Sequence, residues 1–404
     1  MKKIAFVIPW YAEKIPGGAE METREVTKHL KQAGMDVEIL TTCVREFVSD
    51  WNQDYYPEGV EIIQDIPVRR FRVRKRNTRI FDEINLKLMN HIQPTPEEEK
   101  IFIREMINSP ELYQYIREHQ ADYTAFVYIP YMFGTTYYGV QACPEKAVLI
   151  PCFHDEAYFY MQIYRKLYSQ VAGMIFNARP ELDLTEKYYD LNHMQKIVMG
   201  IGMDVHLQSD PDRFRKKFKI PEKFILYAGR KDIGKNIHTL IQYFGAYKKR
   251  NSEKFQKQDE LKLVLLGGGE IAIPESLKRD VIDLGFVEIQ DKYNAYGAAE
   301  LLCQPSKNES FSLVIMESWL CGRPVLVHEQ CAVTKNFVRE SQGGLYFENY
   351  FEFEGCVNYI LEHPKIARQM GRNGGAYVRS HFDWEVITEK YRTFFENLEN
   401  RRSS

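Results

Sequence analysis

The sequence predicts an α/β protein with two doubly wound parallel-sheet domains that face each other across a cleft. A chain of 404 residues exceeds the size at which one hydrophobic core usually keeps growing. A pattern of strand, glycine turn, helix and strand opens the chain, and the same pattern starts again near residue 224. We therefore expect two Rossmann-like domains, over residues 1–205 and 206–384.

The first domain is expected to open with a buried parallel strand over residues 4–8, where every residue is apolar. Gly17 and Gly18 then break the chain, and apolar residues recur at helical spacing as far as Gly34, where a helix C-cap is expected. A strand over residues 37–40 completes a βαβ unit, whose crossover should be right-handed.

The second domain is expected to begin with an apolar strand over residues 224–228, and a further strand over residues 261–266 ends at three glycines. A polar, charged segment places the domain boundary near residues 205–222. After residue 384 a helix is predicted, with one apolar face that must be buried against a domain surface. That face comprises Trp384, Ile387, Tyr391 and Phe395.

The composition is that of an ordinary globular protein, with 44% apolar and 27% charged residues and no apolar run long enough to span a bilayer. The first apolar run stops at Pro9 without a small-residue cleavage site, which favours a strand over a signal peptide. Seven scattered cysteines without CxxC spacing argue against disulfides and a zinc site, and favour a reducing cytoplasm. A net charge of -2 gives no reason to expect nucleic acid as a partner.

One segment is strongly basic, because seven cations fall within residues 69–79. They are Arg69, Arg70, Arg72, Arg74, Lys75, Arg76 and Arg79. Such a block suits an anionic membrane surface or a phosphate-bearing acceptor. An exposed strand and loop solvated by water accounts for the same pattern, and the sequence leaves both interpretations open.

The strongest functional signal is a pair of carboxylates, Glu309 and Glu317, that brackets an expected helix start. A helix beginning just after Ser310 would direct free N–H groups and the positive end of its dipole toward an anion, and a diphosphate is the obvious candidate. The N–H groups concerned belong to Phe311, Ser312 and Leu313. The two carboxylates would accept hydrogen bonds from hydroxyls on either side of the phosphates. A capping residue and a solvated helix glutamate explain the same spacing.

Two cations, Arg230 and Lys235, follow the first strand of the second domain, at the sheet edge where open α/β folds bind ligands. Arginine grips phosphate in a planar, bidentate manner, and lysine supplies a mobile charge. In the first domain, Gly17 and Gly18 open the first helix, and only glycine lets a backbone approach a pyrophosphate so closely.

A possible metal-binding string, Asp-Pro-Asp, occupies residues 210–212. It lies in the charged linker without a preceding strand, so we expect an exposed turn there and no metal site. The two cations and the helix N-terminus already supply the positive field that a metal would provide.

Together these features resemble the retaining family 4 glycosyltransferases of the glycosyltransferase B fold, over nearly the whole chain. The resemblance rests on an ordered set of motifs: Gly-Gly-x-Glu after the first strand, Gly202-Met203-Asp204, Gly-Arg-x4-Lys, Glu-x7-Glu and Gly322-Arg323-Pro324-Val325. The last helix, over about residues 385–404, resembles the family helix that packs back on the N-terminal domain. Residues 199–201 depart from the family, because Met-Gly-Ile replaces the Pro-Asn usual before Gly-Val-Asp.

The resemblance implies a role for each matching residue around the phosphates and the ribose. Gly18, next to Gly17, would offer its amide to the donor phosphates, which Arg230 and Lys235 would neutralise. Glu317 would hold the ribose hydroxyls.

Around the transferred sugar and the base, the resemblance implies three further contacts. Glu309 would grip hydroxyls of the sugar, and His154 would lie beside it, although a histidine in this position also suits a structural role. Phe286 and Val287 belong to the stretch that resembles the base-recognition segment.

The implied activity is the metal-independent transfer of a hexose from a nucleoside-diphosphate sugar, of the UDP or GDP type, to an acceptor hydroxyl with retention. No cofactor is expected. The first acceptor expected is a lipid-linked glycan or lipopolysaccharide intermediate of bacterial cell-surface polysaccharide or glycolipid assembly. The chain would then associate with the inner face of the plasma membrane through residues 69–79.

Three alternatives remain open. The acceptor could be a small soluble molecule. The chain could be an inactive nucleotide-sugar-binding or scaffold protein, although the four catalytic candidates His154, Arg230, Lys235 and Glu309 are all present. A glycan phosphorylase would need a pyridoxal-binding lysine late in the chain, for which the sequence offers no context.

Overall fold

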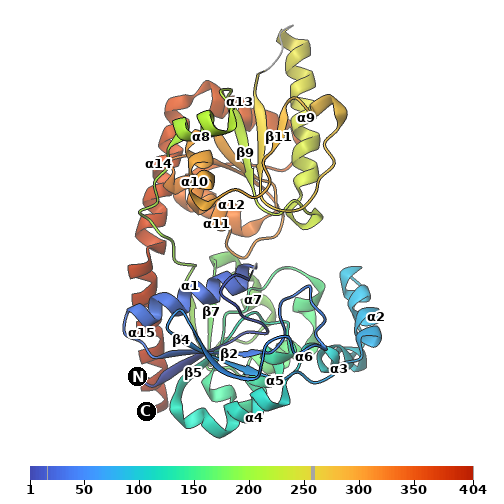
Figure 1. Cartoon of the computed structure of the whole chain (residues 1–404), viewed down its shortest axis with the longest axis vertical. Helices are drawn as coiled ribbons and strands as arrows, with labels where there is room; N and C mark the ends of the chain where they lie inside the picture. Colours follow the sequence, from blue (N-terminus) through green and yellow to red (C-terminus); the bar gives the residue numbers. More distant parts are fainter. Residues whose placement is uncertain (16, 256–259, 404) are drawn as a thin grey trace. The chain divides into compact units, whose positions relative to one another are not determined.

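Two compact units make up the chain in a computed structural model that describes residues 1–15, 17–255 and 260–403. The first unit comprises Met1–Gly202 and Trp384–Ser404, and the second comprises Met203–Asp383. Each unit is built around one sheet with helices on both faces (Figure 1). The predicted pair of parallel-sheet α/β domains is confirmed.

The sheet of the first unit has eight strands in the order β3-β4-β2-β1-β5-β6-β7-β8. Every neighbouring pair is parallel except β3 and β4, which form an antiparallel edge. The strands are β1 (Lys3–Val7), β2 (Val37–Thr42), β3 (Gly59–Ile63), β4 (Ile66–Phe71), β5 (Tyr123–Tyr128), β6 (Ala147–Leu149), β7 (Gly173–Phe176) and β8 (Gln195–Val198).

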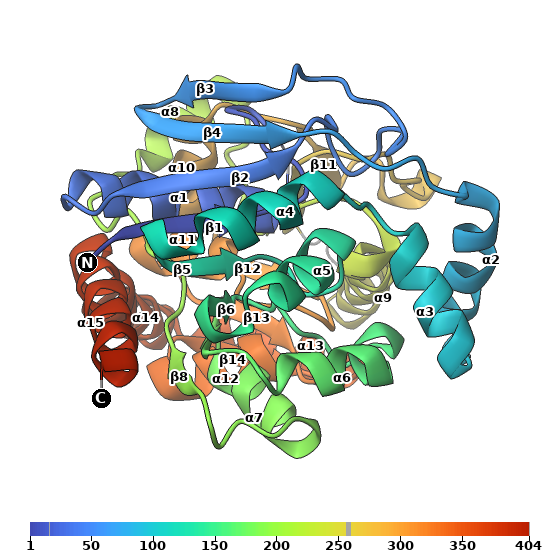
Figure 2. The same cartoon turned by 90° about the horizontal axis from the view of Figure 1, so that it is seen from below.

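Figure 2 shows this sheet with helices on either side. The helix α1 packs against α15, and α4 packs against α5. The helices are α1 (Gly18–Gln32), α2 (Thr78–Met89), α3 (Pro96–Glu105), α4 (Pro110–His119), α5 (Gly134–Ala142), α6 (Gln162–Tyr168), α7 (Arg179–Tyr188) and α15 (Trp384–Ser403), with a 3₁₀ helix η3 (Ala157–Tyr160).

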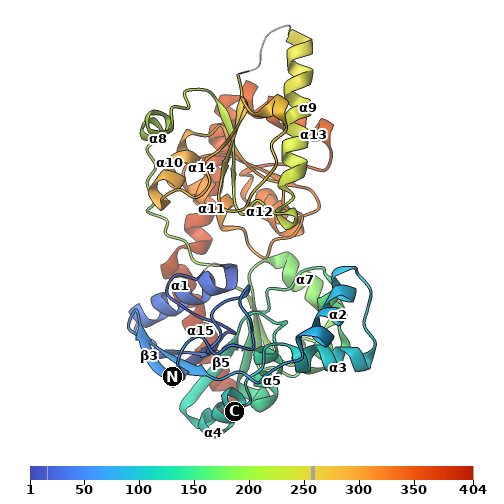
Figure 3. The same ribbon diagram turned by 45° about the vertical axis from the view of Figure 1, so that its right-hand side comes forward.

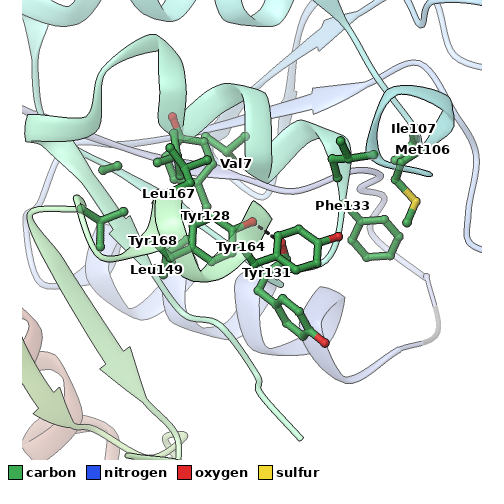
Figure 4. Packing of buried hydrophobic residues seen from close by; sticks show 14 of the residues in the cluster. Val7, Met106, Ile107, Tyr128, Tyr131, Phe133, Leu149, Tyr164, Leu167 and Tyr168 are labelled. Carbon is green, nitrogen blue, oxygen red and sulfur yellow. Dashed lines mark hydrogen bonds between the residues drawn. The ribbon is translucent and has the colours of Figure 1, made fainter. Parts of the chain in front are cut away.

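The core of the first unit is rich in tyrosine (Figure 4). The strand residues Val7, Tyr128 and Leu149 are completely buried, as expected where helices cover both faces of a parallel sheet. Buried tyrosine hydroxyls need partners, and the hydroxyl of Tyr168 donates to the carbonyl of Tyr131.

The sheet of the second unit has six strands, all parallel, in the order β11-β10-β9-β12-β13-β14. In Figure 3 the helices α8 and α10 lie on one side of this sheet and α9 on the other. The strands are β9 (Phe224–Ala228), β10 (Lys262–Leu266), β11 (Val281–Asp283), β12 (Leu301–Gln304), β13 (Val325–His328) and β14 (Gly344–Phe347). The helices are α8 (Pro211–Phe218), the 3₁₀ helix η4 (Ile233–Lys235), α9 (Ile237–Phe255), α10 (Ile289–Ala298), α11 (Leu313–Leu320), α12 (Ala332–Ser341), α13 (Tyr350–Glu362) and α14 (Pro364–Phe382).

The polar segment near residues 205–222, which the sequence predicts to be a linker, contains a helix. Residues 211–218 are α8, and Phe214 on this helix is completely buried, so one face packs on the second unit. Asp210 caps α8 by accepting the N–H of Arg213 at 3.0 Å, so the Asp-Pro-Asp string is a helix start and not an exposed turn. The chain passes from the first unit to the second earlier, after Gly202.

The chain returns to the first unit at Trp384, which begins α15. The indole of Trp384 stacks on the imidazole of His29 with ring centroids 3.8 Å apart, and it lies so close to Gly202 that a Cβ there would come within 2.2 Å of the ring. Only glycine fits at this position.

Among the described residues, no helix is long and apolar enough to cross a membrane.

Two buried carboxyls lie near the carboxyl ends of β6 and β7 in the first unit. Glu181 accepts the N–H groups of Phe153 and Asn177, and Glu22 accepts one hydrogen bond from the side chain of Asn177. Both glutamates are 2% exposed, and burial raises the pKa of each from 4.5 to about 8.

These shifts predict that the first unit loses stability as the pH rises. A raised folded-state pKa means that the stability contributed by protonation is complete below pH 4.5 and is lost as the pH passes through 8. Each carboxyl should lower the free energy of unfolding by up to about 1.4 kcal/mol per pH unit in this window. Urea unfolding should be measured at several pH values across this window, and the free energy of unfolding plotted against pH. The slope of that plot should be shallower for Glu22→Gln than for wild type. It should be unchanged for Glu25→Gln, because Glu25 is a partly exposed residue of the same helix. An identical slope for wild type and Glu22→Gln would contradict the assignment.

Candidate functional site

The candidate site of the second unit lies at the carboxyl edge of its parallel sheet. Arg230 and Lys235 follow β9, and Glu309 follows β12, the strand that pairs directly with β9. The loops after β10 and β11 carry the glycines and the exposed aromatic residue described below. Since all six strands are parallel, these loops share one edge.

Lys235 and Glu309 form an ion pair at this edge. The ammonium of Lys235 lies 2.7 Å from Oε1 of Glu309, although the two residues are 74 positions apart in the sequence. Gln304, at the end of β12, donates to the same oxygen at 3.2 Å. Lys235 also ends η4, where Asp232 accepts its N–H at 3.0 Å. Glu309 is therefore held by a cation and an amide and does not cap a helix.

Arg230 remains largely in solvent. Its side chain is 76% exposed, and its one ion pair in the described chain is with Asp232 at 3.3 Å. An exposed arginine keeps several N–H donors available to a bidentate oxyanion such as phosphate.

The helix expected just after Ser310 begins at Leu313. Ser312 is its N-cap, with a left-handed φ of 82°, so the expectation was two residues early. Helix geometry leaves the N–H groups of Leu313 and Val314 without intrahelical acceptors, whereas Ile315 donates to the carbonyl of Ser312. Val314 was missing from the predicted set.

Two side chains near this helix start are buried for different reasons. The ring of Phe311 packs edge-to-face on Phe337 and Phe382, so only its backbone is available to a ligand. The hydroxyl of Ser312 is buried without a hydrogen-bond partner in the described chain, which is a costly arrangement unless something else bonds to it.

Glu317 is buried in the middle of α11. It is 7% exposed, its Oε1 accepts from Lys292 at 2.6 Å, and its Oε2 accepts from Tyr296 at 2.8 Å. Burial is the main cause that raises the pKa of Tyr296 well above its usual value, and the negative charge of Glu317 adds to this effect. The interpretation of Glu317 as a solvated helix residue is wrong. Each carboxylate oxygen still has a second lone pair for a hydroxyl donor.

Phe286, in the loop after β11, is 85% exposed and lies over Gly268 in the loop after β10. A Cβ on Gly268 would come within 2.5 Å of the Phe286 ring, so the glycine makes room for it. Val287, which follows, is partly buried.

In the first unit, Gly17 is the N-cap of α1 and Gly18 is its first residue. Gly17 has a φ of 136°, and a Cβ there would come within 1.9 Å of the Glu20 carboxylate, which accepts a short hydrogen bond from the indole of Trp10. Nothing lies within 4 Å of a Cβ placed on Gly18, so the space beside it is open.

His154 lies in the loop that follows β6, and it is partly buried. Its carbonyl accepts the N–H of Glu156 at 2.9 Å, and the neighbouring Asp155 accepts the hydroxyl of Tyr160 at 2.7 Å. The loop is therefore held in place by local hydrogen bonds.

The basic block at residues 69–79 is mostly paired with acids of the first unit. The pairs are Arg69 with Glu38, Arg70 with Glu61, Arg72 with Glu58, Arg74 with Glu105 and Arg79 with Glu83. The guanidinium of Arg76 lies 4.5 Å from the ring centroid of Trp51, in cation–π geometry. Much of the positive charge is thus balanced within the first unit.

Four residues at the edge of the second sheet were missed by the sequence reasoning. Lys292 and Tyr296 bond to Glu317, and Lys231 pairs with Asp283. Each partner lies 21 or more positions away in the sequence, so no local pattern joins them. The one local signal for any of these residues was that Lys231 is a second cation directly after Arg230.

Comparison with known proteins relates part of the chain to a family. Residues 208–376 match the model of the family "Glycosyl transferases group 1". The D-inositol 3-phosphate glycosyltransferase of Corynebacterium glutamicum (strain R) is 24% identical over 242 residues, 55% of this chain and 56% of that protein. An uncharacterized glycosyltransferase of Methanocaldococcus jannaschii is 25% identical over 177 residues, 42% of this chain and 43% of that protein. The chain thus aligns with about half of the length of these relatives.

Solved structures match over almost the full chain. Sucrose-phosphate synthase from Thermosynechococcus elongatus has a TM-score of 0.71 at 17% identity, covering 99% of this chain and 100% of that one. Anabaena HepE in complex with UDP-glucose has a TM-score of 0.67 at 17% identity, with coverage of 99% and 100%. WaaG, a glycosyltransferase involved in lipopolysaccharide biosynthesis, has a TM-score of 0.62 at 14% identity, with coverage of 96% and 98%. The chain therefore has the glycosyltransferase B fold, and its residues 208–376 match the glycosyl transferases group 1 family.

Proposed function

We propose that the chain is a retaining glycosyltransferase that transfers a hexose from a nucleoside-diphosphate sugar to an acceptor hydroxyl. The observation that carries the proposal is that Arg230, Lys235 and the N-terminus of α11 lie at one sheet edge with Glu309, whose side chain is 9% exposed. Cations and unpaired N–H groups suit a diphosphate, and a carboxylate beside them suits sugar hydroxyls.

The proposed chemistry uses charge complementarity to the leaving group. As the bond between the anomeric carbon and the phosphate oxygen breaks, negative charge grows on the diphosphate. Arg230 and Lys235 would stabilise that charge, which matters most in the transition state. The acceptor oxygen bonds to the anomeric carbon on the same face, and the departing phosphate takes its proton. No carboxylate is assigned as a covalent nucleophile.

The remaining assignments extend this proposal. Glu317 would hold the ribose hydroxyls through its spare lone pairs, and Phe286 with Val287 would receive the base. Gly18 and His154 belong to the first unit, and the roles that the resemblance implies for them stay predictions. The proposed chemistry uses no metal ion, because Arg230, Lys235 and the N-terminus of α11 would supply the positive field that a metal would provide.

The acceptor is proposed to be a lipid-linked glycan or lipopolysaccharide intermediate of bacterial cell-surface assembly, on the cytoplasmic side of the membrane. The name of WaaG, a protein of lipopolysaccharide biosynthesis, favours this class. A small soluble acceptor is the alternative, and it is favoured by the names of the D-inositol 3-phosphate glycosyltransferases and sucrose-phosphate synthase.

Arg230→Ala should lower the rate of donor turnover by about a hundredfold, as for the loss of one donor to a developing anion. Arg250→Ala is the matched control, because Arg250 is also exposed and paired with one carboxylate, Glu354. Lys235→Ala is less informative, since it also leaves the buried Glu309 without its cation. Turnover should be measured as release of nucleoside diphosphate. A near-normal rate for Arg230→Ala would remove the leaving-group role.

A screen of UDP-, GDP- and ADP-sugars should raise the thermal unfolding midpoint for one base class. A ligand at about 100 times its Kd adds about 2.7 kcal/mol to the free energy of unfolding.

The shift in the unfolding midpoint and the donor turnover should both persist in EDTA. Loss of either in EDTA, with recovery on adding Mg²⁺ or Mn²⁺, would contradict metal independence. A chain that binds a donor without turning it over would instead be the inactive binding protein.

Binding to anionic vesicles should be weak and should fall as salt concentration rises, because most of the basic block is already paired. Arg72 and Arg79 are its most exposed paired members, with side chains 65% and 88% exposed. The double variant Arg72→Gln/Arg79→Gln should therefore reduce cosedimentation with vesicles. Equal cosedimentation of variant and wild type would exclude this block as the membrane contact.

A further inference from the structure

A second ion pair, between Lys231 and Asp283, lies at the same sheet edge. The ammonium of Lys231 lies 2.7 Å from each oxygen of Asp283, so the contact is bidentate on the carboxylate. The Lys231 side chain is 3% exposed and that of Asp283 is 27% exposed. Lysine is almost never so fully buried unless it is paired, because removing an ammonium from water is costly. The sequence neighbours Arg230 and Lys231 thus have opposite environments.

The pair ties together the loops that follow three neighbouring strands. The N–H of Lys231 donates to the carbonyl of Gly268 at 2.7 Å, which joins the loop after β9 to the loop after β10. Asp283 Oδ1 also accepts the N–H of Gly285 at 2.9 Å, within the loop after β11. Gly285 in turn accepts the N–H of Gly267 at 2.8 Å. The chain of contacts therefore closes on itself.

Phe286 is the next residue after Gly285, and its ring lies over Gly268. Both glycines are held by the network just described. An exposed ring on a loop would otherwise sample many orientations, and ordering it on binding would cost conformational entropy. A loop fixed in advance presents the ring without that cost.

We propose that the Lys231–Asp283 pair is a positioning element for the base of a nucleoside diphosphate. It holds the loop over residues 283–287 so that the face of Phe286 is presented to the base for stacking. The inference rests on the proposed function. It assigns a role to two residues for which the proposed function names no contact with the phosphates or the sugar.

A purely structural role for the pair is the competing explanation, and a matched ion pair in the same unit separates the two. Lys262 begins β10 and lies 3.0 Å from Asp280, with side chains 14% and 12% exposed. This pair lies at the other end of β10 from Gly267 and Gly268. Asp280 also pairs with Lys248, so Lys262→Met leaves no carboxylate without a cation.

The test is a double-mutant cycle on the full chain, with Kd values for UDP, GDP and ADP measured by titration calorimetry. Lys231→Met and Phe286→Ala should each weaken binding of the preferred nucleoside diphosphate by about tenfold. If Lys231 acts through the ring, the double variant should bind no more weakly than either single variant. Lys262→Met should bind as wild type. Inorganic pyrophosphate, tested as a competitor of the nucleoside diphosphate, should keep its affinity in all variants, because it has no base.

Other outcomes overturn the inference. Wild-type affinity in Lys231→Met, additive losses of about a hundredfold in the double variant, or an equal loss of pyrophosphate affinity would each do so. If Lys231→Met fails to fold by circular dichroism, Lys231→Met/Asp283→Asn removes both charges and takes its place in the cycle. If wild type binds none of UDP, GDP and ADP, the proposed function itself fails, and that result differs from a wild type that binds while the variants bind equally well.

Discussion

The ion pair between Lys235 and Glu309 controls the charge of the candidate site. It joins the loops after β9 and β12, two strands that pair directly, and its carboxylate is 9% exposed. Without a ligand, Lys235 compensates Glu309, and a buried carboxylate without a cation would be strongly destabilising. A bound diphosphate would also interact with the ammonium of Lys235, while the side-chain amide of Gln304 would continue to donate to Glu309. The same contact therefore stabilises this sheet edge and fixes the groups that are proposed to bind the ligand.

Parallel topology explains why these groups meet at all. In the second unit every strand runs in the same direction, so six successive strand ends deliver their loops to one edge. The helix α11 begins at that edge too, after Ser312, with its positive end there. Side chains far apart in the sequence become neighbours through the sheet register. The edge gathers Lys231 and Lys235 against Asp283 and Glu309, so its cations are balanced by acids before any ligand binds.

Sequence reasoning reached the fold because the fold depends on local patterns. The same kind of pattern singled out the candidate residues, whose roles stay predictions. Continuous apolar runs and glycine turns predict parallel strands followed by helices, and the Glu-x7-Glu spacing locates α11 to within two residues. It could not find partners separated by long stretches of chain. Lys292 contacts Glu317 across 25 positions, and the arginines of β4 find glutamates on β2 and β3. A basic block in the sequence is therefore no measure of free positive charge.

The contrast between Arg230 and Lys231 shows what the fold adds to a motif. The two side chains are adjacent in the sequence, but the first is 76% exposed and the second 3% exposed. Both residues lie in the loop after β9, where one cation stays in the solvent while the other is buried against Asp283. Arginine suits the exposed position because its fork grips phosphate, and lysine suits the buried one because its compact ammonium fits between the two oxygens of Asp283. Exchanging the two residues would keep the net charge of the edge and place each group where its geometry serves poorly. The net charge therefore does not fully describe this edge. Its properties also depend on which of the two positions holds the arginine and which holds the lysine.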